Sequence, residues 1–193
     1  MARAALALFV SVFAAGCMSS GSLHPLFTTE DREFDTGLLG VWRTDDSSSS
    51  VTLTRVTRAN GVEYHISLED SEHKRSAYVG HLLRLDGRFV MDVAPDKDVL
   101  SDSLDDTYKA LLLPLHQFVF VEHTDSTVTT MLLEPDSLER YLSAHPRATS
   151  YALPDSDTVV LTAPTPELRS FIAAYARRRH VFGEPGVWRR AGG

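Results

Sequence analysis

The strongest constraint on the fold is an alternation of apolar and polar residues over positions 62–69. The apolar members are Val62, Tyr64, Ile66 and Leu68, and the polar ones are Glu63, His65, Ser67 and Glu69. A period of two places successive side chains on opposite faces of a β-strand. The pattern therefore predicts a strand with one face in the protein interior and the other in water.

Further segments have the composition of strands. They are residues 51–56, 77–85, 88–93, 118–123 and 127–133, with residues 40–42 and 186–190 near the two ends of the domain. Asp86-Gly87 has the composition of a hairpin turn, and residues 124–126 have hairpin length. About eight mostly antiparallel strands predict a barrel or a sandwich.

Two helices are expected among the strands. Asp136 or Ser137 is a candidate cap for a short helix that ends at His145-Pro146. For a second helix we expect Thr165 as the cap and Pro166 at the first position. Its apolar stripe is formed by Leu168, Phe171, Ile172 and Tyr175. We interpret Arg177, Arg178 and Arg179 as cations that complement the dipole at its end, in preference to a phosphate or lipid-headgroup patch.

The first residues have the organisation of a secretory signal, with Arg3 before an apolar run that is too short to span a bilayer. Ala14-Ala15-Gly16-Cys17 resembles the lipobox of bacterial lipoproteins, although Ala14 replaces the usual leucine. The resemblance implies removal of residues 1–16, a lipid on Cys17, a tether over residues 17–23 and one domain over residues 24–193. Residue 18 is Met where Asp signals retention in the inner membrane, which implies the outer membrane facing the periplasm. The alternative is an ordinary cleaved signal followed by a free cysteine.

Composition excludes several other arrangements. Cys17 is the one cysteine of the chain, so no intrachain disulfide can form and stability must come from the core. The formal net charge is −7, which argues against nucleic acid as a partner and against a domain that rests flat on an anionic bilayer. The expected contact with the membrane is therefore the lipid anchor.

The two ends of the domain add a family resemblance. Gly40-Val41-Trp42 resembles the Gly-x-Trp motif of lipocalins and other calycins, in which an arginine of the last strand packs across the tryptophan. Here Arg189 or Arg190 could take that role of barrel closure. The resemblance implies an antiparallel up-and-down β-barrel of about eight strands, with one or two helices outside it. The helix expected near Leu138 departs from the lipocalin order, and the alternative is that Trp42 and Trp188 are core residues of another β-rich fold.

Signatures of catalysis and metal binding are weak. The chain has no nucleophile elbow, no phosphate-binding glycine loop and no zinc-binding helix motif. His65, His81, His116 and His123 lie on expected strands without a spacing that requires a shared metal. Residues 95–108 contain Asp96, Asp98, Asp102, Asp105 and Asp106 but lack the pattern of a calcium loop, so we expect a solvated acidic loop. We therefore expect no enzyme activity, no metal and no cofactor.

Two functions remain from the sequence. The first, implied by the lipocalin resemblance, is binding of a lipid or other apolar small molecule in the barrel. The candidate ligand-binding residues are Tyr64, Ile66, Leu68, Phe118 and Phe120, the last two only if they face inward. The second is a non-enzymatic interaction protein of the cell envelope, whose barrel is filled by its own side chains. A carrier requires an apolar void of roughly 300 Å³ or more.

Overall fold

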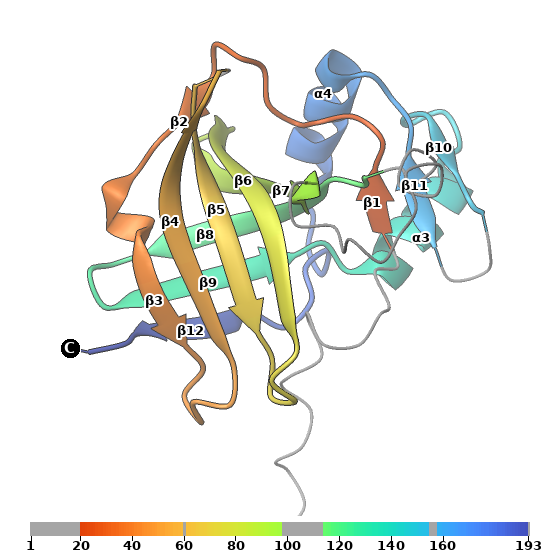
Figure 1. Cartoon of the computed structure of the whole chain (residues 1–193). Coiled ribbons are helices and arrows are strands. Elements are labelled where there is room, and N and C mark those ends of the chain that lie inside the picture. Colours follow the sequence, from red (N-terminus) through yellow and green to blue (C-terminus); the bar gives the residue numbers. More distant parts are fainter. Residues whose placement is uncertain (1–19, 60, 98–113, 155–157, 193) are drawn as a thin grey trace, which may run out of the picture.

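The chain folds into a closed antiparallel β-barrel, with two helices packed outside it (Figure 1). The computed structural model describes residues 20–59, 61–97, 114–154 and 158–192. Within them, the barrel strands are β3 (Gly40–Arg43), β4 (Ser50–Arg58), β5 (Gly61–Glu69), β6 (Arg75–Leu85), β7 (Arg88–Pro95), β8 (Gln117–His123), β9 (Thr127–Leu132) and β12 (Gly186–Arg190). Each strand pairs with the next, and β12 returns to β3 and closes the barrel. The predicted lipocalin-like, up-and-down barrel is thus confirmed.

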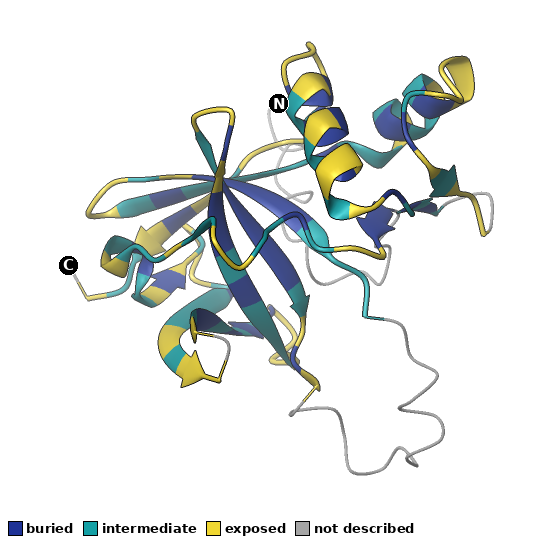
Figure 2. Ribbon diagram, turned by 90° about the horizontal axis from the view of Figure 1, so that it is seen from above, coloured by how far each residue is buried: buried dark blue, intermediate teal, exposed yellow. Residues whose placement is uncertain are grey.

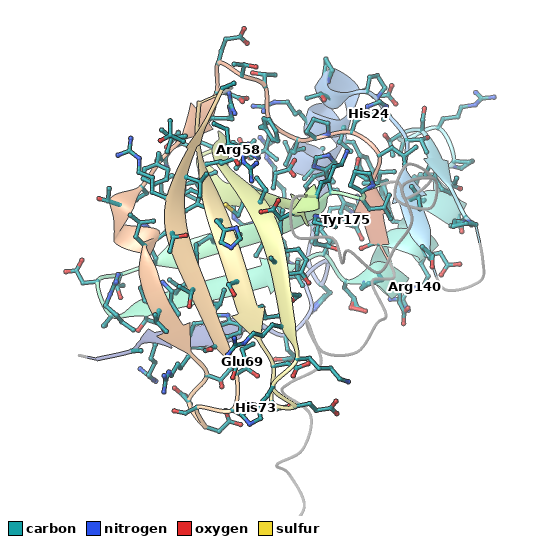
Figure 3. All side chains as sticks on the ribbon, in the orientation of Figure 1. His24, Arg58, Glu69, His73, Arg140 and Tyr175 are labelled. Carbon is teal, nitrogen blue, oxygen red and sulfur yellow. The ribbon has the colours of Figure 1, made fainter. Side chains whose placement is uncertain are left out.

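Hairpins define one end of the barrel. Between β6 and β7, Asp86 and Gly87 have φ angles of 53° and 80°, as a type I′ turn requires. The turns after β4 and β8 lie at the same end, which we call the closed end. The connections after β3, β5, β7 and β9 lie at the other, which we call the far end. Figure 3 shows Arg58 at the closed end of the long strands, and Glu69 and His73 at the far end.

The two α-helices of the described residues lie in the long connection between β9 and β12. They are α3 (Pro135–Ala144) and α4 (Thr165–Tyr175), with the short strands β10 (Tyr151–Ala152) and β11 (Val159–Leu161) between them. Figure 2 shows buried and exposed residues on different sides of both helices, as expected for helices packed on one side only. The predicted stripe of Leu168, Phe171, Ile172 and Tyr175 is the buried side of α4, which confirms that part of the prediction.

The predicted starts and ends of the helices need correction. α3 starts at Pro135, with Glu134 at the N-cap, so neither Asp136 nor Ser137 caps it. Pro164 is the N-cap of α4, and the Thr165 hydroxyl donates to the carbonyl of Pro25. The arginines also follow the helix and do not close its last turn: Arg177 pairs with Asp86, with a nitrogen–oxygen distance of 2.6 Å. Tertiary partners replaced the local caps that the sequence pattern suggested.

The first described residues belong to the folded domain. β1 (Ser20–Ser22) is buried and pairs in parallel with β11. β2 (Arg32–Glu33) then pairs with β6, and the 3₁₀ helix η1 (Thr36–Leu38) leads into β3. The predicted tether over residues 17–23 is therefore too long, because residues 20–22 are part of a sheet.

Apolar side chains form two cores on opposite faces of the barrel wall. The inner core lies inside the barrel and includes Trp42, Ile66, Met91 and Trp188. The outer core lies between the barrel and the helices; its members include Val90, Phe118, Phe120, Leu168 and Ile172. Among the described residues, no helix has both the length and the apolarity needed to cross a bilayer.

Candidate functional site

The barrel encloses an apolar cavity of about 80 Å³. Its wall is formed by Leu38, Trp42, Val51, Leu53, Ile66, Leu68, Tyr78, Met91, Val93, Val119, Val121, Val128, Thr130 and Trp188. These residues come from η1 and from all eight barrel strands, because every second residue of a barrel strand points inward. None of these described wall residues carries a charge.

Polar atoms of the wall are bonded within the protein. The indole nitrogen of Trp188 donates to Oγ1 of Thr130 at 3.2 Å, and that hydroxyl donates to the carbonyl of Gly186 at 3.4 Å. The indole nitrogen of Trp42 donates to the carbonyl of Leu38 at 2.9 Å. Tyr78 also has an interaction partner. An occupant would therefore find apolar surface and few free donors or acceptors.

Trp42 and Arg190 seal the closed end. Trp42 is 1% exposed, and the guanidinium carbon of Arg190 lies 4.1 Å from the centre of its ring. The same guanidinium donates to the carbonyls of Gly37, Leu39 and Asp125 at 2.6–2.8 Å. The predicted contact between this tryptophan and an arginine of the last strand is therefore present, and Arg190 makes it. Arg189 points out of the barrel and pairs with Asp45.

Tyr64 supports the closed end from inside. Its hydroxyl donates to the carbonyl of Asp35 and accepts from the amide of Asp35, at 2.9 and 2.7 Å. The carboxylate of Asp35 accepts from the amide of Gly37 and pairs with His123. Burial of the Tyr64 ring raises the pKa of its hydroxyl to about 12. Tyr64 is thus inward-facing, as predicted, but it holds η1 in place and does not line the cavity.

The remaining candidate ligand-binding residues divide between the two faces of the wall. Ile66 and Leu68 line the cavity as predicted. Phe118 and Phe120 belong to the outer core, so the condition that they face inward is not met and they do not line the cavity. Val119 and Val121 are the residues of β8 that face the cavity. Phe120 instead packs against Phe182, with ring centres 4.9 Å apart, and its ring also receives Arg88.

A polar cluster lies on the outer surface of the barrel under the N-terminal segment. Asp92 is 1% exposed; its carboxylate accepts from the amide of Leu26 and contacts Nδ1 of His116, both at 2.6 Å. Nearby, His81 lies 3.3 Å from Glu63 and stacks on Phe27. Burial lowers the pKa of His81, and the attraction of Glu63 offsets this only in part. The sequence pattern gave no indication that these carboxylates are buried.

This cluster has the groups of a hydrolase triad but not its geometry. Ser22 and His116 exchange backbone hydrogen bonds, but the hydroxyl of Ser22 donates to the carbonyl of His24 at 2.8 Å. Ser22 is also fully buried. A nucleophile must be accessible and within hydrogen-bond reach of its base, so the arrangement is structural.

Asp96 departs from the expected acidic loop. It is 5% exposed and contacts Arg58 and His65, so it is not a solvated residue. Asp98, Asp102, Asp105 and Asp106 lie outside the described residues. In the part of the chain that the structure describes, no group of three or more histidine, cysteine, aspartate or glutamate residues could hold a metal ion.

Several cavity residues were not predicted. Met91 and Val93 on β7 and Val128 on β9 face inward, and the inward position of Thr130 follows from that of Val128 by alternation. The alternation of inward and outward residues along each strand was the sequence signal that could have found them.

Cys17, the predicted lipid attachment site, lies outside the described residues. No protein-family model, curated protein or solved structure matches this chain.

Proposed function

We propose that this chain is an exported, non-enzymatic lipoprotein that binds a small apolar molecule in its barrel. Its anchor is a lipid on Cys17, and its place is the outer membrane facing the periplasm. The observation that carries the ligand proposal is the uncharged cavity wall, in which Trp42, Trp188 and Thr130 use their polar groups within the protein. Apolar sites of this kind bind through exclusion of water from apolar surface.

The size of the cavity limits the occupant. Pockets that hold drug-sized ligands measure about 300–1,000 Å³, and an engineered cavity of about 150 Å³ binds benzene. At about 80 Å³ the cavity is smaller than the roughly 300 Å³ expected for a carrier that encloses a whole ligand. The proposed occupant is therefore a short alkyl segment, or the end of a longer chain whose remainder lies outside the barrel.

The same volume favours a second candidate function. A barrel of eight strands is just wide enough for its own side chains to fill it, and Trp42, Met91 and Trp188 occupy much of the interior. In that case the domain is an interaction protein of the cell envelope, and its surface meets the partner. The two candidates differ in whether an apolar molecule enters the barrel.

Tryptophan fluorescence tests the ligand proposal directly. Both tryptophans of the chain line the cavity, so xenon, a single uncharged heavy atom that binds in small apolar cavities, should quench their emission on entry. Iodide is the matched probe, because an ion does not enter an uncharged apolar cavity. We expect saturable quenching by xenon and little by iodide.

A cavity-filling variant supplies the control. Val119→Leu adds one methylene to the wall and should weaken quenching by xenon several-fold, while it changes stability by no more than about 0.8 kcal/mol. Val187→Leu makes the same change on the outside of the barrel, where Val187 is 39% exposed, and should leave quenching unchanged. Absence of saturable quenching in the unmodified protein would favour the filled barrel.

The anchor has its own test. Labelled fatty acid should enter the unmodified protein and not the Cys17→Ser variant, because only the sulfur accepts the lipid. Equal labelling of both proteins contradicts the lipoprotein proposal.

A further inference from the structure

The lipid anchor proposed at Cys17 lies close to the folded domain. Cys17 is three residues before Ser20, which is the first residue of β1. A fully extended chain spans at most about 3.6 Å per residue, so Cys17 lies within about 11 Å of Ser20. A domain on so short a connection cannot turn freely above the bilayer, and the surface around β1 must stay near the lipid.

β1 lies beside the far end of the barrel. Ser22 exchanges two backbone hydrogen bonds with His116, which directly precedes the first residue of β8. A β-carbon placed on Gly21 would lie 3.1 Å from Leu115, which shows how closely β1 approaches this connection. β8 starts at the far end, opposite Trp42 and Arg190. Figure 1 shows β1 beside the barrel wall, on the same side as the helices.

Cavity residues reach the same end. Leu68 is one residue from the end of β5, and Val93 is two residues from the end of β7. The first residues of β6 lead to Tyr78, which also lines the cavity. Among the described residues, these side chains form the part of the cavity wall nearest the far end.

An exposed leucine lies next to the point where the anchored segment joins the domain. In the small sheet, Ser20 is aligned with Val159 of β11; Ala152 of β10 is aligned with the next residue, Val160, and Leu153 directly follows Ala152. Leu153 is therefore about 10 Å from Ser20, two strand spacings away. It is 44% exposed, the largest exposed fraction among the exposed large hydrophobic side chains of the described residues.

We propose that the anchored protein docks on the bilayer through the small sheet of β1, β10 and β11, with the far end of its barrel next to the lipid. The docking partner is the lipid surface, and the apolar ligand reaches the barrel from it. This inference rests on the lipid anchor of the proposed function. The net charge of −7 repels anionic lipid, so electrostatic attraction does not hold the docking surface on the bilayer. The lipid anchor and Leu153 hold it there.

Site-specific labels test the orientation. After acylation of Cys17 an introduced cysteine is the only free thiol. A fluorophore can therefore be placed at Ala152→Cys, beside the unchanged Leu153, or, as the control, at Asp125→Cys in the closed-end turn; both positions are exposed. The acylated proteins are bound to vesicles of phosphatidylethanolamine and phosphatidylglycerol that contain a nitroxide headgroup quencher. Quenching at position 152 should be at least two-fold stronger than at position 125.

A variant with a longer tether distinguishes the proposed orientation on the bilayer from the proposed lipid anchor. Ten glycine and serine residues inserted between Ser19 and Ser20 should reduce the difference between the two labels. Equal quenching with the natural tether, or stronger quenching at position 125, overturns the orientation while the anchor stands. Protein that fails to float with the vesicles overturns the anchor itself, and both proposals with it.

Discussion

At the scale of single residues, Arg190 joins more parts of the closed end than any other side chain discussed above. It covers Trp42 and donates to three carbonyls. These belong to Gly37 in η1, to Leu39 directly after η1, and to Asp125 in the turn between β8 and β9. Hydrogen bonds from a charged donor contribute about 1.5–3 kcal/mol each where they are buried, and the stacked guanidinium adds about 0.5–2 kcal/mol.

We therefore expect Arg190→Ala to lower the free energy of unfolding by about 2–4 kcal/mol. Arg189→Ala is the matched control, because Arg189 is exposed and its pair with Asp45 is a surface ion pair that contributes no more than about 1 kcal/mol. Urea titrations of both variants make the comparison. Equal losses would show that the stacked arginine does not close the barrel.

His81 predicts a dependence of stability on pH. Its pKa in the folded protein lies below the ordinary value of 6.5, because burial disfavours the charged ring. As the pH falls below about 6.5, the unfolded chain binds a proton that the folded chain does not, so stability decreases. The decrease ends once the pH passes the lower pKa of the folded state.

In His81→Gln this part of the decrease should be absent. His73→Gln is the control, since the side chain of His73 is 85% exposed in the turn after β5. Free energies of unfolding between pH 7.5 and 5 measure both variants against the unmodified protein. An unchanged slope in His81→Gln, together with the same slope in His73→Gln, would contradict the assignment.

At the scale of single elements, the turn between β6 and β7 depends on glycine for its backbone. A β-carbon at Gly87 would meet no atom within 4 Å, so space does not exclude alanine there. Its φ of 80° does, because side-chain-bearing residues lose about 1–2 kcal/mol in this region. We expect Gly87→Ala to lower the melting temperature by several degrees.

Gly183→Ala provides the comparison. A β-carbon at Gly183 also meets nothing within 4 Å, and its φ is not in the positive range, so stability should stay the same or rise slightly. A similar loss in both variants would mean that the conformation of the turn is not what costs stability.

β8 shows why the positions of the strands could be predicted from the sequence, whereas the residues of this strand that point into the barrel could not. Alternation marks β5, because its inward residues Tyr64, Ile66 and Leu68 are buried, whereas the outward residues after Glu63 are only partly buried. Phe118, Val119, Phe120 and Val121 are all buried, since β8 has the barrel core on one side and the helices on the other. A strand buried on both faces loses the period of two, so the sequence pattern could not decide whether Phe118 and Phe120 or Val119 and Val121 face inward.

The alternation of inward and outward residues along β12 could have shown which of the two candidate arginines packs on Trp42. Trp188 faces inward, so Arg190 shares its face and Arg189 does not. No such rule was available for Asp92 or Asp96. Their burial depends on Leu26, His116 and Arg58, which come from distant parts of the chain. Contacts of this kind leave no local pattern in a sequence.

At the scale of the whole molecule, the barrel wall is shared by two cores that cannot be separated. β7 contributes Met91 to the inner core and Val90 to the outer one, and β8 does the same with Val119 and Phe120. Loss of the helices would expose the outer side chains of these strands to water. We therefore expect the barrel and the helices to unfold in one cooperative transition.

Two truncations test this expectation. Leu168→Ala in α4 removes a fully buried side chain from the outer core and should lower the free energy of unfolding by about 3–5 kcal/mol. Ile66→Ala truncates a side chain that already borders the cavity, and should lower the free energy of unfolding by about 2 kcal/mol. Trp42 and Trp188 lie in the barrel, so their fluorescence reports the inner core, and far-ultraviolet circular dichroism at helix wavelengths reports α3 and α4. In Leu168→Ala both signals should shift to the same lower temperature, because the wall transmits the loss to the inner core. If the helical signal melts first while the tryptophan signal keeps its original midpoint, the helices are a separate layer and the barrel is stable without them.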